Sequence, residues 1–393
     1  MTLRQAPSLI DVARLAGVST ATAGRALGGY GSVRDGTRER VAAAAAELGY
    51  RSNDLARSMI TGSTRLIGVV VPDVTNPFFA SALRGIADAA QSNGFDVLLA
   101  NSDRDVVAEA RAVHVMASKR VDGVVVAAAD PQRGGHLVEL VDRGTPVVLL
   151  DRVARGLEGV SSVMIDHEGA MHAAVEHLLG LGHRRIGILT QASRAGVVVA
   201  GAGSEPREGA GGAGAAGSTL ASGDGASTGG GPGGEASAIG PAAALPSQLR
   251  LLAYLDALRD ADIEAQPSWM ASAPYDRDAA CAAARALLER SDRPSALVCT
   301  DSVLAAGAYQ AAQELGLRVP DEVSLLGFDD DAWTTLVRPQ LSVVQQPSYE
   351  LGVASARRLL GLVTGAGGDA PGTSLRLPAV VVPRASTGAP GPA

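Results

Sequence analysis

Residues 9–27 read LIDVARLAGVSTATAGRAL, and this stretch decides how the N-terminal part of the chain folds. Ser8 can cap a first helix with Asp11 as its capping-box partner, and apolar residues recur on one face of that helix. Gly17 permits a tight turn, and Ser19 can cap a second helix. This order is typical of a helix-turn-helix, whose second helix can enter the major groove of DNA.

A third helix is predicted from Thr37 to Leu48, where Val41, Ala45 and Leu48 form an inward stripe before Gly49. Together the three helices predict a small all-α headpiece. On the local sequence alone, a plain three-helix bundle with solvated arginines remains an alternative interpretation.

The second helix of this headpiece presents residues suited to reading bases. Its first turn exposes Thr20 and Ala21, and Arg25 returns to the same face. Arg25 is the candidate for a bidentate contact to guanine. Hydroxyl side chains at the helix starts would hold phosphates, namely those of Ser19, Thr22 and Thr37.

Charge is unevenly distributed along the chain. The net charge is −7, yet residues 1–65 carry nine arginines against five acidic residues. A basic N-terminal part on an acidic body suits a protein that touches DNA with one end.

After Arg65 the pattern changes to short β-branched runs that alternate with amphipathic helices, which predicts parallel sheets covered by helices. Two series of strands indicate two lobes with a ligand-binding cleft between them. The first series is 66–71, 95–100, 123–127 and 146–150; the second is 162–165, 185–189, 296–299 and 324–328.

Ala192 to Pro246 consists almost entirely of Gly, Ala, Ser and Pro, which predicts a disordered insertion within the body. Its glycines lack the Gly-Lys-Ser/Thr ending of a phosphate loop and the dinucleotide fingerprint after a strand. We therefore expect no bound nucleotide cofactor there.

Neither the cysteines nor the histidines have the spacing of a metal site, so we expect no metal. The start of the chain has no apolar signal core, and no run approaches the ~18 apolar residues of a membrane span. These features predict a cytoplasmic protein without a membrane partner.

Several motifs, taken in order, make the sequence resemble the LacI/GalR (lactose-repressor) family of bacterial regulators. The similarity runs from Leu9 to about Thr387, interrupted by the insertion. The motifs are Asp11-Val-Ala-Arg-Leu-Ala-Gly-Val-Ser19, Thr37-Arg-Glu-Arg-Val41, Glu47-Leu-Gly-Tyr50, Asn53-Asp-Leu-Ala-Arg-Ser-Met59, Ile67-Gly-Val-Val-Val-Pro-Asp73, Asn76-Pro-Phe-Phe79, His177-Leu-Leu-Gly-Leu-Gly-His183 and Gly327-Phe-Asp329.

The resemblance implies four parts: a helix-turn-helix domain at 8–52, a hinge helix at 53–62 that folds on operator DNA, a two-lobed periplasmic-binding-protein-like body at 63–387, and the insertion at 192–246 within it. In the hinge, Met59 matches the apolar wedge that enters the minor groove and kinks the duplex. The implied DNA contacts in the hinge are Asn53, Ala56, Arg57 and Met59. Ala23, Gly24, Gly28 and Met59 depart from the family's usual residues.

The resemblance also implies an effector site and three chain crossings between the lobes, near Ile165, Gln345 and Thr364. Acidic groups and an arginine can bond vicinal hydroxyls while aromatic rings stack on a sugar, which favours a sugar-like effector. The residues that match pocket positions are Phe78, Phe79, Asp151, Arg250, Tyr275, Thr300 and Asp329. The acidic residues nearby have an alternative structural role, since Asp301, Asp330 and Asp331 can cap helices.

A single recognition helix reads too few bases for genomic specificity, so we expect a homodimer on a pseudo-palindromic operator. The favoured function is a repressor that a small-molecule effector releases from DNA; activation, or tighter binding with a corepressor, stays open. A free solute-binding protein would lack the helix-turn-helix, and an enzyme would need Asp151 and Asp329 to act as a glycosidase-like pair.

Overall fold

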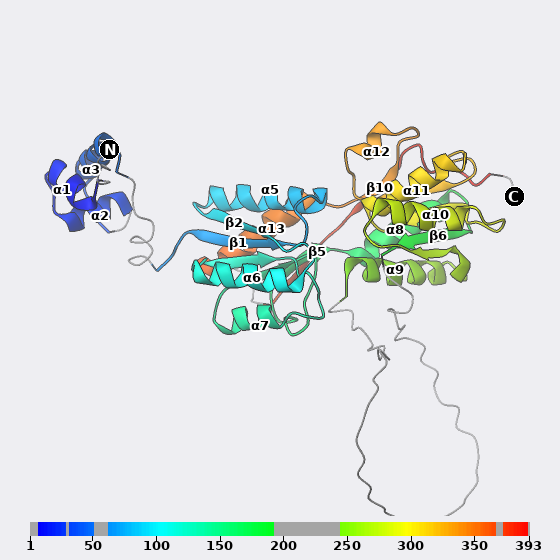
Figure 1. The fold of residues 1–393 in the computed structure, drawn as a ribbon, viewed down its shortest axis with the longest axis horizontal. Coiled ribbons are helices and arrows are strands. Elements are labelled where there is room, and N and C mark those ends of the chain that lie inside the picture. The colour runs from blue at the N-terminus through cyan, green and yellow to red at the C-terminus, as the bar shows by residue number, and fades with distance from the viewer. Residues whose placement is uncertain (1–6, 29–30, 51–61, 192–243, 367–371, 392–393) are drawn as a thin grey trace, which may run out of the picture. The chain divides into compact units, whose positions relative to one another are not determined.

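The computed structural model describes residues 7–28, 31–50, 62–191, 244–366 and 372–391. The chain divides into two compact units, residues 1–165 with 347–377 and residues 166–346 with 378–393. The first unit contains three N-terminal helices and an α/β lobe, called here the first lobe, and the second unit is the second lobe (Figure 1). An all-α headpiece followed by a two-lobed α/β body confirms the predicted fold class.

The headpiece consists of α1 (Leu9–Leu15), α2 (Thr20–Gly28) and α3 (Asp35–Leu48). The predicted capping box at Ser8 and Asp11 is confirmed. The third helix begins at Asp35, two residues earlier than predicted, and ends at Leu48; the next residue is Gly49, whose φ of 63° suits a glycine. The buried core is built from small apolar side chains: Val12, Ala13, Ala16, Ala23, Ala26, Val41, Ala44 and Ala45.

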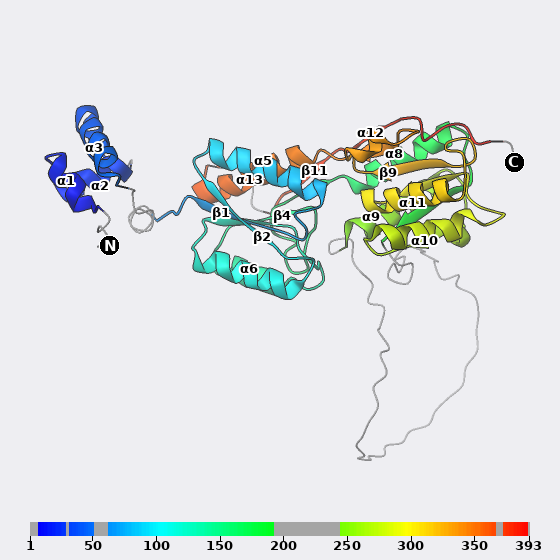
Figure 2. The ribbon, with the colours of Figure 1, turned by 45° about the horizontal axis from the view of Figure 1, so that its top comes forward.

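The first lobe has a six-stranded parallel sheet in the order β11-β5-β4-β3-β1-β2. Helices α5 and α13 cover one face, and α6 and α7 cover the other (Figures 1 and 2). The strands are β1 (Leu66–Val71), β2 (Asp96–Asn101), β3 (Gly123–Val126), β4 (Val147–Leu150), β5 (Ser162–Ile165) and β11 (Ser374–Leu377); the helices are α5 (Pro77–Ser92), α6 (Val106–Ser118), α7 (Gly135–Asp142) and α13 (Ser348–Thr364).

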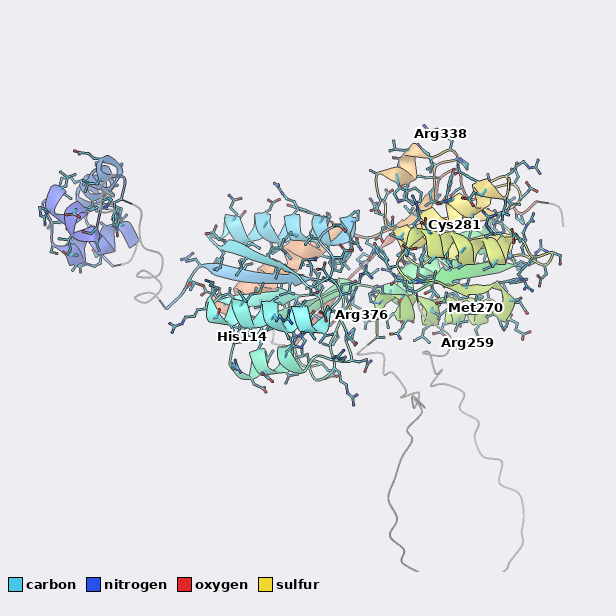
Figure 3. All side chains as sticks on the ribbon, in the orientation of Figure 1. His114, Arg259, Met270, Cys281, Arg338 and Arg376 are labelled. Carbon is cyan, nitrogen blue, oxygen red and sulfur yellow. The ribbon has the colours of Figure 1, made fainter. Side chains whose placement is uncertain are left out.

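The second lobe repeats this arrangement in the order β12-β10-β9-β8-β6-β7, with β12 antiparallel to β10. Helix α9, which carries Arg259, and α10, which carries Cys281, belong to this lobe (Figure 3). The strands are β6 (Ile186–Thr190), β7 (Met270–Ser272), β8 (Ala296–Cys299), β9 (Ser324–Phe328), β10 (Ser342–Gln345) and β12 (Val380–Val382); the helices are α8 (His167–Gly180), α9 (Pro246–Asp260), α10 (Arg277–Leu288), α11 (Ser302–Glu314) and the short α12 (Trp333–Leu336), with a 3₁₀ turn at Pro267–Trp269.

All eight predicted strands occur, but two aspects of their organisation were wrong. The strand at 162–165 is β5, which pairs with β4 and so belongs to the first lobe rather than opening the second. The third crossing follows Leu377 rather than Thr364, because the chain adds β11 to the first sheet before it leaves.

The predicted insertion at 192–246 falls mainly on residues 192–243, which lie outside the described residues. The described chain resumes at 244, and Pro246 is already the first residue of α9. None of the described helices is long and apolar enough to cross a membrane.

Glycines let two helices of the first lobe approach closely. A β-carbon at Gly352 of α13 would overlap the carbonyl oxygen of Ala82 in α5, and one at Gly85 would overlap that of Tyr349. Because α13 follows the second lobe in sequence, this contact ties the returning chain into the first lobe.

Candidate DNA interface and effector-binding residues

The turn between α1 and α2 has the geometry predicted for a helix-turn-helix. Gly17 has a φ of 67°, a conformation that side chains disfavour, and the Val18 amide donates to the Ala13 carbonyl at 3.0 Å. The Ser19 hydroxyl accepts from the Thr22 amide at 3.2 Å, which confirms Ser19 as the cap of α2.

Helix α2 has one buried face and one exposed face. Ala23 and Ala26, at 0% and 7% exposure, pack into the headpiece core. Thr20, Ala21 and Arg25 are exposed, and at ~100° per residue they span an arc of about 140° away from the buried alanines. The structure therefore places the three predicted base-reading residues on one accessible side of α2.

Arg25 lies against the backbone of the loop that follows α2. A β-carbon built on Gly31 would lie 3.2 Å from Cδ of Arg25, and Gly31 itself has a φ of 72°. No ion pair joins Arg25 to a carboxylate within the described part of the chain. Gly31 was a neighbour of Arg25 that the sequence did not reveal.

The hydroxyl residues predicted to hold phosphates are at the starts of helices. The Ser19 and Thr22 hydroxyls are 2.9 Å apart, and Thr37 lies half-buried in the first turn of α3. Their phosphate contacts remain a prediction. The hinge residues Asn53, Ala56, Arg57 and Met59 lie outside the described residues.

In the first lobe, the predicted aromatic pair opens α5 just beyond β1. The Asn76 side chain caps this helix by accepting from the Phe78 amide at 2.9 Å, with Pro77 in the first turn. The Phe78 and Phe79 rings meet edge to face, with centroids 5.0 Å apart, and both residues are buried.

Asp151 follows β4 directly, with a φ of 66°, and is 7% exposed. Arg152 links it to its surroundings, since Nε lies 3.3 Å from the Asp151 carboxylate and Nη1 donates to the Ala128 carbonyl at 3.1 Å. The Arg152 guanidinium also lies 5.9 Å from the Phe79 ring centroid. Sequence reasoning missed Arg152, although it is the last residue of the run Val147-Val-Leu-Leu-Asp-Arg152.

In the second lobe, Arg250 of α9 is buried at 5% exposure and has several neighbours. It donates to the Thr300 carbonyl at 2.5 Å and from Nε to Nδ1 of His167 at 3.4 Å. Its guanidinium lies 4.2 Å from the Phe328 ring centroid. A buried guanidinium held this way is oriented by the protein, and His167 and Phe328 were not identified from the sequence.

Asp329 follows β9 and occupies in its lobe the place that Asp151 occupies after β4. The two strands hold the same position in the two sheet orders, and Asp329 has a φ of 69°. Gln346, another residue missed from the sequence, donates to its carboxylate at 2.5 Å. Burial raises the Asp329 pKa to about 6, although the nearby Arg250 charge lowers it.

The remaining predicted pocket residues differ in their surroundings. Thr300 is 1% exposed, and its hydroxyl oxygen has no hydrogen-bond partner among the described residues. Tyr275 lies half-buried in the loop after β7, which is the edge strand of its sheet. The structure thus brings Arg250, Thr300 and Asp329 together and puts Tyr275 on a separate loop.

The helix-capping alternative is confirmed for one aspartate and wrong for two. Asp301 caps α11 by accepting from the Leu304 amide at 2.9 Å, and burial raises its pKa. Asp330 instead pairs with Arg384 at 2.7 Å, and Asp331 accepts from Ser302. Helix α12, which follows them, begins without a side-chain cap.

Two of the sequence's histidines hold the C-terminal segment. His183 bonds the Gly388 carbonyl at 2.9 Å, and His177 bonds the Thr387 hydroxyl at 3.0 Å. Burial lowers the pKa of both imidazoles. Within the described ranges, no three His, Cys, Asp or Glu residues are grouped to hold a metal ion.

Comparisons with known proteins cover most of the chain. Residues 8–53 match the family described as bacterial regulatory proteins, lacI family. Residues 64–208 match the periplasmic binding proteins and sugar binding domain of the LacI family, and residues 237–387 match a periplasmic binding protein-like domain. Catabolite control protein A of Priestia megaterium is 30% identical over 352 residues, 90% of this chain and 91% of that protein.

The chain belongs to the LacI family of bacterial regulatory proteins. The transcriptional repressor CytR of Escherichia coli strain K12 is 29% identical over 92% of this chain and 91% of its own length. A lac repressor dimer bound to operator and the anti-inducer ONPF matches with a TM-score of 0.75 and 25% identity, covering 98% of this chain and 100% of that one. A complex of the regulator CelR with cellobiose matches with a TM-score of 0.64 and 26% identity, covering 97% and 99%.

As a LacI-family protein, the chain is a DNA-binding transcription regulator and not an enzyme. Asp151 and Asp329 are therefore not a glycosidase pair. Their shared place after β4 and β9 reflects the repeated lobe architecture of the LacI-family body.

The raised pKa of Asp329 predicts a pH-dependent contribution to stability. Its folded-state pKa of about 6 exceeds the ordinary 3.8, so the stability it contributes is fully present below about pH 4 and is lost as the pH rises through 6. Relative to Asp329→Asn, the wild-type unfolding free energy should fall on the order of 2 kcal/mol over this window. Urea unfolding of both proteins from pH 4 to 7 measures the difference, and parallel stability profiles would contradict the assignment.

Proposed function

We propose that the chain is a homodimeric repressor that binds a pseudo-palindromic operator and releases it when a small-molecule effector binds. The observation that carries this proposal is the exposed side of α2, where Thr20, Ala21 and Arg25 stand opposite the buried alanines. The relative CytR is named a repressor, and the similar lac repressor structure is a dimer on operator DNA.

The proposed reading of the DNA sequence follows from the chemistry of the base edges in the major groove. Arg25 would donate in a bidentate manner to O6 and N7 of a guanine, a contact worth ~1–3 kcal/mol against the wrong base. Thr20 and Ala21 would contact neighbouring base edges, and the hydroxyls of Ser19, Thr22 and Thr37 would bind phosphates and fix the register.

A hinge at residues 53–62 would complete the interface in the minor groove. There Met59 would act as the apolar wedge, with Asn53, Ala56 and Arg57 as neighbouring contacts. We assign residues 8–52 to the DNA-binding domain and residues 63–387 to the effector-binding and dimerisation body, with an insertion at 192–246 inside it.

The proposed dimer face runs along one edge of the first lobe. Strand β2 is an edge of its sheet, and Leu99 on it is 40% exposed. Val107 and Val115 of α6, the helix that carries His114 in Figure 3, are 50% and 48% exposed. Exposed apolar side chains beside an unpaired strand edge favour association with a second copy.

The proposed effector is a sugar or related metabolite. The carboxylates of Asp151 and Asp329 and the guanidinium of Arg250 would bond hydroxyls, and Phe78 and Phe79 would pack on apolar faces. Tyr275 and Thr300 would be the remaining contacts to the effector. The orphaned Thr300 hydroxyl supports the proposal, since buried polar atoms almost always have a partner. The similar CelR structure contains cellobiose. Because the chain belongs to a family of bacterial DNA-binding regulators, we assign the protein to the cytoplasm.

Arg25→Ala should abolish operator preference without preventing dimerisation. The operator is first selected from random duplex DNA with the wild-type protein, and affinities for it and for scrambled DNA are then compared. The variant should bind operator and scrambled DNA about equally, because the guanine contact specifies sequence whereas phosphate contacts do not. A variant that still discriminates operator from scrambled DNA would refute the base-reading role.

Gly31→Ala tests whether the position of Arg25 matters in the same assay. The new β-carbon would displace the Arg25 stem, so the variant should lose part of the operator preference. Gly49→Ala is the matched control, because Gly49 has a similar φ of 63° but no neighbour within 4 Å. Equal losses in the two variants would show that backbone strain alone is responsible.

A thermal-shift screen against sugars, polyols and nucleosides should find a compound that raises the wild-type melting temperature, because ligand binding stabilises the folded state. Thr300→Val keeps the side-chain shape and removes the orphaned hydroxyl, so its own stability should not fall while its response to the hit weakens. An unchanged response would place Thr300 outside the pocket. In the selected-operator assay the hit should release DNA, and tighter binding would make it a corepressor.

A further inference from the structure

The first two chain crossings each join a strand of one lobe almost directly to a helix of the other. Strand β5 ends at Ile165 in the first lobe, and α8 begins at His167 in the second. Strand β10 ends at Gln345 in the second lobe, and α13 begins at Ser348 in the first. With so few residues between regular elements, a shift of the backbone on one side of a crossing is passed to the other side.

A side chain beside each of these crossings bonds a group that we propose binds the effector. Gln346 is the last residue of the second lobe before the chain crosses, and its Nε2 donates to the Asp329 carboxylate at 2.5 Å. His167, just after the other crossing, accepts at Nδ1 from Nε of Arg250 at 3.4 Å. Both bonds lie within the second lobe. The polar groups of this lobe are therefore joined to the points at which the chain enters and leaves it.

The bond from Gln346 responds to what happens at the Asp329 carboxylate. The Asp329 backbone is fixed to β10, because its amide donates to the Val344 carbonyl at 3.0 Å. The Gln346 side chain is buried at 9% exposure, and its hydrogen bond lowers the Asp329 pKa against the larger, opposite effect of burial. Effector hydroxyls that donate to this carboxylate share its acceptor positions with the Gln346 amide. A change at the carboxylate is therefore passed to Gln346 rather than absorbed by the loop.

On the other side of this crossing, α13 is packed backbone to backbone against α5. Pro347 precedes α13, and a β-carbon built on Gly352 would overlap the carbonyl oxygen of Ala82. One built on Gly85 would overlap the carbonyl oxygen of Tyr349 in the first turn of α13. No layer of side chains separates the two helices at these points, so a displacement of α13 also displaces α5. Helix α5 follows β1, the strand at which the body begins.

We propose that Gln346 is a positioning residue that transmits effector binding from Asp329 to the first lobe. This rests on the proposed sensing of an effector by the polar groups of the second lobe. Gln346 acts through Asp329, and the chain carries the change into α13. Its loss therefore separates two properties that otherwise occur together: the effector still binds, but the affinity for operator no longer responds to it.

The experiment uses the full chain, the operator selected by the wild type, and cellobiose, glucose, ribose, sorbitol and adenosine as probes. The probe that most raises the wild-type melting temperature is carried forward. Operator affinity is measured with and without a saturating amount of that probe, and the ratio of the two affinities is the coupling. Gln346→Met keeps the length of the side chain and removes the amide. In this variant the probe should still raise the melting temperature, while the coupling should fall by about threefold or more.

Gln345→Met is the matched control for this variant. Gln345 is the neighbouring glutamine at the same crossing, but it is exposed, so its replacement should leave the coupling as in wild type. A purely structural role of Gln346 would lower the free energy of unfolding without changing the coupling, and urea unfolding of both variants measures that contribution. Wild-type coupling in Gln346→Met would overturn the proposal. Loss of probe binding would overturn it too, because Gln346 would then belong to the binding site itself.

Gln346→Asn provides a second variant if Gln346→Met fails to fold. It keeps a polar amide but is one methylene shorter, so its bond to Asp329 is lost or weakened, and the coupling should fall with the circular dichroism unchanged. A folded Gln346→Asn with wild-type coupling would count against the proposal. Failure of the proposed function looks different, because no sugar, polyol or nucleoside would then stabilise the wild type, and this inference would fall with it.

Discussion

The packing of α2 onto the rest of the headpiece is the interaction on which DNA reading depends. Ala23 and Ala26 are small enough for the helices to approach closely, and they orient α2 so that Thr20, Ala21 and Arg25 face outward. A headpiece this small has few apolar side chains to bury, so its geometry comes from small residues, the left-handed glycines Gly17, Gly31 and Gly49, and helix caps rather than from a large core.

The two lobes of the body share one arrangement of strands and helices. Both lobes place short polar segments at the carboxyl ends of parallel strands, which is where open α/β sheets bind ligands. Asp151 and Asp329 follow strands in matching positions, yet their partners differ: Arg152 neighbours the first, whereas Gln346 and the buried Arg250 neighbour the second. The repeated fold therefore places two chemically different carboxylate environments after equivalent strands.

Local signals predicted the headpiece well, because helix caps and the glycine turn are encoded within a few residues. The buried strands were equally visible as Val-rich runs. Four strands, β7, β10, β11 and β12, were missed, since short strands take their identity from the neighbours they pair with. For the same reason the third crossing was predicted too early. Strand-end residues such as Asp151 and Asp329 could be found from sequence, and their chain neighbours Arg152 and Phe328 were within reach of the same reasoning. His167 could not be found, because only folding brings it beside Arg250.

Guanine methylation interference tests the central claim most directly, that α2 reads bases in the major groove through Arg25. Methylating N7 of guanine blocks the acceptor that a bidentate arginine needs. The account predicts that methylation of one guanine in each half-site prevents wild-type binding and has no further effect on Arg25→Ala. An identical interference pattern for both proteins, or interference confined to minor-groove adenines, would contradict it.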